Sequence, residues 1–476
     1  MHRAFQLLVS IIAFAATLAI SEPLLDPLPE PIERGSQETK LRVIADGMVS
    51  PVHATHAPGD RNRIFVADQQ GIAYAIDLAT GTKTVFLDIV ERTLTTGGYD
   101  EKGLLGLAFH PRFWINGLFY TYTSETPEGD ADFPWDSPFT FGLHQSVINE
   151  WRVDNPLNPA ALPDANSPRE IMRIDQPTGF HNGGALVFDR RGNLLIALGN
   201  GGPLETGQDN SSVLGSILRI IPNANYAPYG NHYPSSNGQY LIPESNPFNS
   251  DAEAHDEIYA HGFRHPYRIS VDRRTNEIYA GDVGNNDIEE VDLVTAGENY
   301  GFPIKEGSFC FTGSGGPPDG SPGVEDPSTC TEAAAGLTDP LAEYDHDEGV
   351  AVIGGYVYRG RAMRWRLGGT YIFGDFNGRL FYLDGETIRE LGLSGQDSLG
   401  GALLGMGEDT RGELYLLVND TGRAFGTSGR LIKLDPLQSD LDERQRRLEM
   451  WREWWRNLRW WQWRDWHSSW NDPAGR

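Results

Sequence analysis

One unit of sequence recurs along most of this chain, and it limits the fold more than any other feature. Each copy joins two apolar-alternating segments through a turn rich in Asp and Gly, as in ALVFDRRGNLLIALGNGG at residues 185–202. Six copies begin at residues 60, 103, 185, 268, 354 and 402. Alternation with a period of two indicates β-strands, and recurrence of one unit is typical of repeat architectures.

About four short strands per copy predict an all-β fold, a six-bladed β-propeller with four-stranded blades over residues 40–436. Two packed β-sandwiches are the alternative, but they do not explain why each hairpin repeats one order of apolar residues, Asp and Gly. We expect the insertions at residues 125–146, 223–255 and 307–348 to form loops at the faces of the disc. Inner strands of a propeller line a central channel, so a residue just before one is expected at the channel mouth.

The N-terminal residues precede this repeat. Residues 1–21 combine a basic start, an apolar run and the small residues Ala19 and Ser21, which predicts a signal peptide cleaved near Ser21. A membrane anchor is the alternative, but the apolar run is short for a span. The protein is therefore expected to be periplasmic or secreted. Residues 22–39 are rich in Pro and acidic residues, and we expect an extended leader along the surface.

The charge of the chain narrows the class of partner, and its two cysteines predict a crosslink. The formal net charge of −27 argues against nucleic acid, because phosphate binding needs a basic surface. Cys310 and Cys330 flank a loop rich in Gly, Pro and Ser. Export favours a disulfide between them, which would stabilise the fold by roughly 3 kcal/mol, and two free thiols are the alternative.

Polar residues precede the strand segments of several copies. Glu101 comes before the second copy, His181 before the third, and Arg264 with His265 before the fourth. A neutral imidazole can remove a proton from an alcohol, and a guanidinium can hold an anionic or quinone-like ligand. A histidine that caps a turn and a surface ion pair are the alternatives. The two glycines of the HNGG motif are expected to let a flat ligand approach the backbone.

The segment GDVGNNDIEEVDLVTAGENYGFP at residues 281–303 is the most specific one. The turn at Gly284 and Asn285 could direct carbonyl oxygens at a hard cation. Glu290 and the Tyr300 carbonyl could serve a second calcium, because calcium takes mixed carboxylate and carbonyl oxygens. The alternative is a structural turn whose Asn and Asp side chains bond their own backbone.

Several signatures of other enzyme classes are missing from the sequence. It has no Walker loop, no strand-to-helix GxGxxG, no GxSxG, no CxxC and no HExxH. Their absence argues against NAD enzymes, ATPases, serine hydrolases and zinc proteases. A propeller lactonase or phosphotriesterase would need a ring of Asn, Asp and Glu in the channel, and the sequence shows no clear one.

Five motifs, in order, resemble the soluble glucose/sorbosone dehydrogenase family: GLLGLAFHPRF, HNGG, HGFRHPYR, GDVGNNDIEEVDL with GENYGFP, and YIFGDFNGRL. That family includes aldose dehydrogenases that depend on pyrroloquinoline quinone (PQQ), and hedgehog-interacting proteins carry the same domain. The resemblance implies a propeller with PQQ lying across the channel mouth on a calcium ion. It also implies oxidation of an aldose sugar or related polyol, with electrons passed to an external acceptor.

The resemblance implies a role for each candidate residue. His181 matches the general base that takes the anomeric hydroxyl proton of the sugar as hydride passes to the quinone, and Arg264 matches the arginine beside the cofactor. The carbonyls of Gly284 and Asn285 match the ligands of the calcium that polarises PQQ. The structural calcium of the family is matched by Glu290 and the Tyr300 carbonyl.

The chain departs from the family pattern at the cofactor contacts. Family enzymes usually have Gln at the position of Glu101 and Asn at that of His265, two residues that we still predict to contact the cofactor. Phe376 stands where a cofactor lysine is expected, and the arginine pair expected before the sixth copy is not evident in LGGALLGMG. PQQ is a tricarboxylate, and each lost charge-assisted bond removes about 1.5–3 kcal/mol. The alternative function is therefore a non-catalytic propeller of this family that binds a glycan or protein at the channel mouth.

The C-terminal residues 437–476 differ from everything before them. Most of the tryptophans of the chain lie here, interleaved with arginines. Leu448, Trp451, Trp455 and Leu458 recur at the spacing of one helix face, which predicts an amphipathic helix. We expect this helix either to pack on the side of the propeller or to make peripheral contact with a membrane, because Trp and Arg favour the headgroup region.

Overall fold

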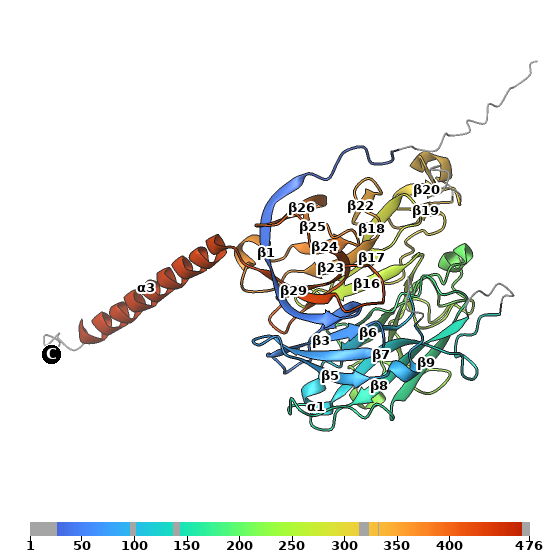
Figure 1. The fold of residues 1–476 in the computed structure, drawn as a ribbon, viewed down its shortest axis with the longest axis horizontal. Coiled ribbons are helices and arrows are strands. Elements are labelled where there is room, and N and C mark those ends of the chain that lie inside the picture. Colours follow the sequence, from blue (N-terminus) through green and yellow to red (C-terminus); the bar gives the residue numbers. More distant parts are fainter. Residues whose placement is uncertain (1–25, 96–100, 137–142, 314–322, 332, 469–476) are drawn as a thin grey trace, which may run out of the picture.

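The computed structural model describes residues 26–95, 101–136, 143–313, 323–331 and 333–468, with the backbone alone over 457–468. The signal peptide predicted over residues 1–21 lies outside the described residues. Short β-strands dominate the body of the molecule (Figure 1), as the alternating sequence pattern predicts.

Four-stranded antiparallel units follow one another along the first half of the chain. The first contains β2 (Pro51–Thr55), β3 (Arg63–Asp68), β4 (Ile72–Asp77) and β5 (Lys83–Asp88). The second contains β6 (Leu104–Phe109), β7 (Leu118–Glu125), β8 (His144–Arg152) and β9 (Arg169–Gln176). The third contains β10 (Leu186–Phe188), β11 (Leu194–Ala197), β12 (Ser216–Ile220) and β15 (Ile258–His261).

Three more units complete the body. The fourth contains β16 (Pro266–Val271), β17 (Ile278–Asp282), β18 (Ile288–Val294) and β22 (Ala342–Asp345). The fifth contains β23 (Val352–Val357), β24 (Tyr371–Asp375), β25 (Leu380–Asp384) and β26 (Thr387–Leu393). The sixth contains β27 (Ala402–Glu408), β28 (Leu414–Asn419) and β29 (Gly429–Asp435), with β1 (Arg34–Met48) as its fourth strand.

Strand β1, near the N-terminal end of the described chain, pairs with strands β26 and β29 near its C-terminal end. It pairs antiparallel with β29, and its first residues pair parallel with β26. The extended leader predicted over residues 22–39 is therefore paired strand from Arg34 onward. The prediction missed this because residues 34–40 lack the apolar alternation, and only pairing with two distant strands fixes them.

The first strands of the six units form a closed ring, which we call the inner ring. β2 contacts β6, which contacts β10, and contacts continue through β16 and β23 to β27, which pairs with β2. Two packed sandwiches would leave open sheet edges instead of closing this ring. The described residues thus have a propeller-like β structure, in line with the repeat.

Apolar side chains packed between neighbouring units form the core. Strand β7 is buried along its whole length, although its sequence LFYTYTSE alternates apolar and polar residues. Its two faces both lie against protein, so the small hydroxyl-bearing residues are enclosed as well. Trp151 illustrates how such groups are satisfied, because its indole N–H donates to the hydroxyl of Thr121 at 2.8 Å.

The long insertions carry small elements of their own rather than loops alone. β13 (His232–Pro234) pairs with β14 (Leu241–Pro243), and β19 (Lys305–Glu306), β20 (Phe309–Phe311) and β21 (Val324–Glu325) form a small sheet. A disulfide joins Cys310 to Cys330 across a sequence separation of 20, which confirms that prediction. The short helices are α1 (Phe113–Asn116), α2 (Arg364–Leu367), η1 (Val90–Arg92), η2 (Leu204–Gln208), η3 (Ala224–Tyr226) and η4 (Pro327–Cys330).

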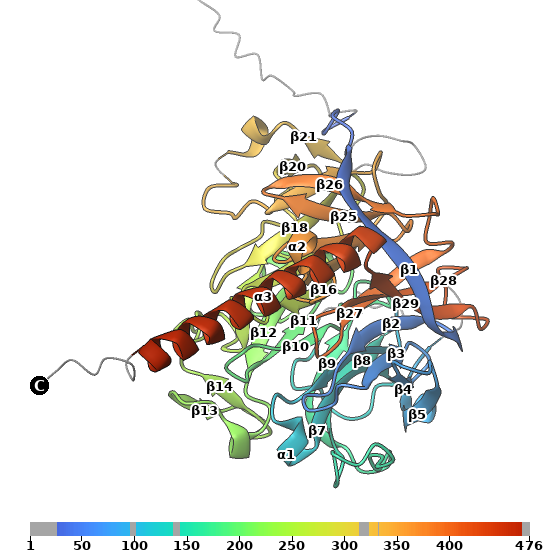
Figure 2. The ribbon, with the colours of Figure 1, turned by 90° about the vertical axis from the view of Figure 1, so that its left-hand side faces the viewer.

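Helix α3 (Gln438–Ser468) extends away from the β structure (Figures 1 and 2). Its base is fixed by an ion pair of 2.7 Å between Arg366 and Asp440. Farther along, the exposed fractions of Trp451, Trp454 and Trp455 are 59%, 57% and 46%. Over these residues the helix is not packed on the side of the body, the first of the two placements considered for it. Among the described helices, none combines the length and apolar character needed to cross a membrane.

Candidate functional site

A cavity of about 250 Å³, the site cavity, lies where the strands of the inner ring begin. Residues from the segments that lead into β6, β10 and β16 line it, as the propeller argument predicts. Six of the eight residues predicted for the site line this cavity: Glu101, His181, Arg264, His265, Gly284 and Asn285. They come from four separate stretches of sequence, and closure of the inner ring makes them neighbours.

The imidazole of His181 is held by two partners. The Nη2 of Arg264 lies 3.1 Å from its Nε2, and the Oδ1 of Asn200 lies 2.7 Å from its Nδ1. A guanidinium can only donate, so Nε2 accepts, and the ring proton sits on Nδ1 and is donated to Asn200. Burial, followed by the charge of Arg264, lowers the pKa of His181 to about 3. The ring is therefore neutral, with a lone pair on Nε2 inside the cavity.

The backbone at His181 adopts an unusual conformation. Its φ of 54° lies in the left-handed region that non-glycine residues rarely occupy. Strain of this kind is typical of sites where the surrounding structure fixes a side chain for function. The next loop contacts this backbone, because the N–H of Gly201 donates to the His181 carbonyl at 3.3 Å.

The two glycines of the HNGG motif, Gly183 and Gly184, allow neighbouring strands to pack closely and do not make room for a ligand. Gly183 and Gly184 have φ values of 67° and 104°, which favour glycine. A Cβ on Gly183 would lie 2.5 Å from the Ala197 carbonyl oxygen, and one on Gly184 would lie 2.4 Å from the Leu105 Cβ. Neither glycine lines the site cavity. The expectation that they let a flat ligand approach was wrong, because neighbouring strands occupy that space.

Glu101 connects the two histidines of the cavity. Its carboxylate accepts a hydrogen bond from the His181 backbone N–H, and it lies 3.9 Å from the Nδ1 of His265. The rings of His181 and His265 are 5.5 Å apart. Burial, followed by the nearby His181 and Arg264, lowers the pKa of His265 well below its usual value. Both imidazoles are thus neutral in the cavity wall.

Arg264 is positioned by the end of β17. The carboxylate of Asp282 accepts hydrogen bonds from the backbone N–H groups of Arg264 and His265, at 2.9 and 2.6 Å. The Nη1 of Arg264 donates to the Val283 carbonyl at 3.0 Å. Its buried Nε has no partner among the described residues. Nη1 and Nη2 each carry a second N–H beyond the one used for Val283 and His181, and these leave donor capacity for an anionic or carbonyl-bearing ligand.

The turn after β17 is arranged to present carbonyl oxygens. The Oε1 of Glu306 accepts hydrogen bonds from four consecutive backbone N–H groups, starting at Asn285 with 2.6 Å and Asn286 with 2.9 Å. In a trans peptide the C=O points opposite to the N–H. The carbonyls of Gly284 and Asn285 therefore point away from Glu306. Because both residues line the site cavity, this arrangement suits a hard cation.

Comparison with known proteins decides which family this architecture represents. The model of the glucose/sorbosone dehydrogenase family matches residues 49–370 of the chain. This protein belongs to the glucose/sorbosone dehydrogenase family. The resemblance inferred from the five motifs is thereby confirmed.

The relatives share low sequence identity with this chain. The HIPL1 protein of Arabidopsis thaliana is 28% identical over 76% of this chain, and the human Hedgehog-interacting protein is 27% identical over 83%. The aligned regions cover only 59% and 52% of those two relatives. A solved PQQ-bound aldose sugar dehydrogenase from Streptomyces coelicolor superposes with a TM-score of 0.57 at 20% identity, covering 85% of this chain and 99% of that one. At that identity the structural similarity supports the fold alone.

Two of the eight residues predicted for the site, Glu290 and Tyr300, do not line the site cavity. Glu290 is buried in β18 and accepts a hydrogen bond of 2.6 Å from the Gly307 backbone N–H. Burial and then the neighbouring Asp292 raise its pKa well above the usual value. The ring of Tyr300 stacks on Phe263 at 4.6 Å. Within the described residues no group of three or more His, Cys, Asp or Glu side chains could hold a metal, so the second calcium stays a prediction.

Other residues of the site were not singled out from the sequence. Asn200 and Glu306 act on site residues 19 and 21 positions away, and no local pattern marks such partners. Arg423, from the loop between β28 and β29, lines the cavity and supplies a cation on the sixth unit. The expected arginine pair was sought before β27, but this arginine comes after β28. Phe376 lines the cavity as well.

Proposed function

We propose that this family member is an exported, PQQ- and calcium-dependent dehydrogenase that oxidises an aldose sugar or a related polyol. One observation supports the proposal most strongly. The neutral imidazole of His181 has its basic nitrogen in the site cavity, beside the guanidinium of Arg264 and the turn at residues 284–285, whose carbonyl oxygens point away from Glu306. The proposal takes the six four-stranded units as the blades of a single six-bladed β-propeller over residues 40–436.

The residues present fit an anionic cofactor with a divalent cation. The guanidinium of Arg264 and that of Arg423 bring two cations to the cavity wall, and neither forms an ion pair with a carboxylate of the described residues. Calcium would be held by the carbonyls of Gly284 and Asn285, which Glu306 turns away from itself. When bound, PQQ would supply a two-electron acceptor for the hydride of the sugar, and calcium would increase its electrophilicity.

The chain's own residues would handle the proton and the orientation of the sugar. The Nε2 of His181 accepts the hydroxyl proton, a role that suits an imidazole that is unprotonated at neutral pH. Asn200 keeps the ring in the tautomer that leaves Nε2 free of a proton. Arg264 occupies Nε2 at 3.1 Å, so a substrate hydroxyl must displace that contact to reach the base. An external acceptor then receives the electrons.

A non-catalytic propeller that binds a glycan or protein ligand at the same mouth is the alternative. Two observations favour it. The carboxylate of Glu101 lies in the cavity wall and would repel a tricarboxylate, and Phe376 brings a ring where a cofactor lysine was expected. One relative, the human protein, carries the name Hedgehog-interacting protein.

Dye-linked activity distinguishes these two functions. The mature chain is purified, loaded with PQQ and calcium, and assayed for dye reduction with a panel of aldoses and polyols. Activity with at least one sugar, and its loss in His181→Ala, would support the dehydrogenase. Full activity in His181→Ala would remove His181 from the role of base. PQQ binding without turnover of any sugar would favour the binding function.

The proposal also includes export and contact with a membrane surface. Export rests on the signal peptide predicted over residues 1–21, with cleavage near Ser21, and the disulfide between Cys310 and Cys330 suits an oxidising compartment. Peripheral membrane contact rests on α3, which extends away from the body (Figure 1) and carries the exposed Trp451 and Trp454. Tryptophan rings favour the membrane interface.

A further inference from the structure

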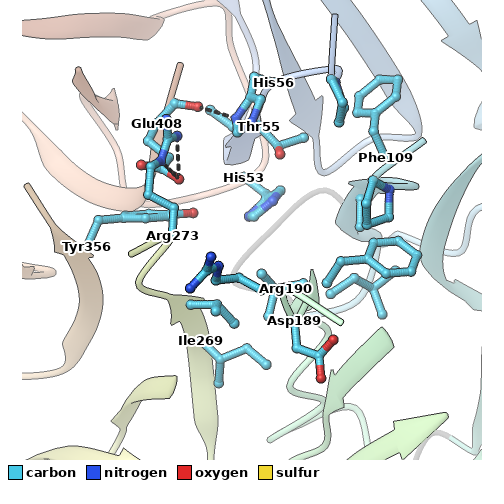
Figure 3. Close-up of a pocket in the computed structure, with 18 residues that line it drawn as sticks. His53, Thr55, His56, Phe109, Asp189, Arg190, Ile269, Arg273, Tyr356 and Glu408 are labelled. Atoms are coloured by element: carbon cyan, nitrogen blue, oxygen red, sulfur yellow. Dashed lines mark hydrogen bonds and ion pairs between the residues drawn. The ribbon is translucent and has the colours of Figure 1, made fainter. Parts of the chain in front are cut away.

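A second cavity of about 350 Å³ lies at the opposite end of the inner ring. Residues from the later parts of the ring strands line it, among them His53, Phe109, Ile269 and Tyr356, and Figure 3 shows them around one opening. The cavity with His181 is lined by residues at the strand starts instead. The volume of the second cavity falls within the range of about 300–1,000 Å³ that is typical of small-molecule sites.

Buried Arg268 separates the two cavities. Its Nε donates to the Val52 carbonyl at 3.0 Å and its Nη1 to the Tyr267 carbonyl at 2.8 Å, and both acceptors belong to residues that line the site cavity. Its Nη2 has no partner in the described part of the chain. On the other side, its charge acts on His53. The second cavity is therefore a distinct compartment with a positive charge behind its floor.

His53 offers the second cavity an unused hydrogen-bond acceptor. The side chain is buried between the ring strands and lines the second cavity. Its Nδ1 has no partner among the described residues. Burial, followed by the charge of Arg268, lowers the pKa of His53 to about 3, so the ring is neutral and one of its two nitrogens carries a lone pair. A buried acceptor without a donor is unfavourable, and a ligand hydroxyl would satisfy it.

Arg190 supplies a positive charge at the mouth of the second cavity. Its Nη1 donates to the Arg274 carbonyl at 2.7 Å, and no carboxylate of the described residues forms an ion pair with it. The Asp189 carboxylate accepts the backbone N–H groups of its own turn and points away from His53 in Figure 3. Arg273 and Glu408 pair with each other at 2.7 Å. The charge of Arg190 is therefore left for a ligand anion.

The walls between these two polar groups are largely apolar. Phe109 and Phe188 present aromatic rings, and Leu186, Ile269 and Pro111 complete the surface. A sugar would leave several hydroxyl groups without partners against such walls. A flat aromatic ring would bury apolar area on both faces.

We propose that the second cavity is a binding site for a small hydroxylated aromatic carboxylate. The ligand hydroxyl donates to the neutral imidazole of His53, the ring lies between the apolar walls, and the carboxylate pairs with Arg190. This site is independent of the proposed dehydrogenase chemistry, because it shares no lining residue with the site cavity.

Binding of simple probes to the full mature chain tests this proposal. Para- and meta-hydroxybenzoate are titrated by calorimetry, and at least one is expected to bind with one-to-one stoichiometry. Benzoate lacks the hydroxyl and the corresponding hydroxybenzamide lacks the charge, and each is expected to bind about tenfold more weakly. This comparison of ligands examines His53 without replacing a buried residue. If neither hydroxybenzoate binds, or if benzoate binds equally well, the proposal is overturned.

Variants place the binding site in the chain. Arg190→Gln is expected to weaken hydroxybenzoate binding about tenfold and to abolish the preference over the benzamide. Arg191→Gln removes the neighbouring exposed charge, which does not line the cavity, and is expected to leave binding unchanged. His181→Ala in the site cavity is also expected to leave it unchanged. If His181→Ala abolishes binding while Arg190→Gln does not, the probe occupies the site cavity and the proposal fails.

Discussion

The Nη2 of Arg264 lies 3.1 Å from the Nε2 of His181, and this contact fixes the protonation state of the imidazole. A donor-only guanidinium on Nε2 requires the ring proton on Nδ1, where Asn200 accepts it at 2.7 Å. Burial and the charge of Arg264 lower the pKa of His181 to about 3. The site therefore contains a preformed, neutral imidazole with its lone pair in the cavity.

This low pKa makes His181 destabilise the folded protein in acid. The pKa is about 3 in the folded state and about 6.5 in an unfolded chain, so the unfolded chain binds the extra proton between these values. The free energy of unfolding should fall by about 1.4 kcal/mol per pH unit per such histidine as the pH drops below 6.5. His181→Asn, which tolerates the positive φ, should lack this contribution.

Urea unfolding of wild type and His181→Asn between pH 4.5 and 7.5 measures the difference. Other buried histidines, such as His53, contribute equally to both proteins and cancel. The two stabilities should differ by an amount that changes with pH below 6.5 and is constant above it. Parallel curves over the whole range would show that His181 titrates normally in the folded protein.

Glu306 should control the cation affinity of the site cavity. Glu306→Gln weakens a carboxylate that accepts four backbone N–H groups, so the carbonyls of Gly284 and Asn285 should lose their fixed direction. Calcium binding, measured by calorimetry with PQQ present, should weaken about tenfold or more.

A matched control separates this effect from general destabilisation. Glu413 is also buried and accepts two backbone N–H groups, those of Arg361 and Ala362, but it does not line the site cavity. Glu413→Gln should lower the melting temperature and leave calcium affinity unchanged. Equal calcium affinity in wild type and Glu306→Gln would contradict the role given to Glu306.

The disulfide should stabilise the small sheet beside the fourth unit. Replacing both Cys310 and Cys330 by Ser should lower the free energy of unfolding by about 3 kcal/mol, the value expected for closing a loop of this size. Urea unfolding with and without reductant provides the measurement. Reduced wild type should have the same free energy of unfolding as the double variant. A double variant as stable as oxidised wild type would contradict the stabilising role of the disulfide.

The sequence predicted the inner ring and the residues that precede its strands, because alternation and turn residues are local signals. Glu101, His181 and Arg264 could be placed at one mouth for that reason. Glu306 could not, since its partners become known only once the small sheet packs against the turn after β17. The same holds for β1, whose pairing with β26 and β29 depends on chain closure. The glycines of HNGG were identified correctly as special, but their reason lay in strand packing that only coordinates reveal.

Helix α3 should contribute to membrane association. Deleting residues 448–476 removes the exposed tryptophans of the helix and keeps the Arg366–Asp440 ion pair at the helix base. The full chain should cosediment with vesicles of mixed zwitterionic and anionic lipid, and the truncated chain should remain in solution. Triple replacement of Trp451, Trp454 and Trp455 by Ser, which keeps the helix length, should give the same loss. Binding that is equal in all three proteins, or absent in all, would end this part of the proposal.

The central claim is that separate stretches of the chain meet in one cavity built for PQQ and calcium. Titration of the mature chain with PQQ, followed by calorimetry with and without calcium, tests it most directly. We predict one PQQ per chain at micromolar concentration, with binding that depends on calcium and weakens in Arg264→Gln. No binding of PQQ at micromolar concentration with calcium present would contradict the claim.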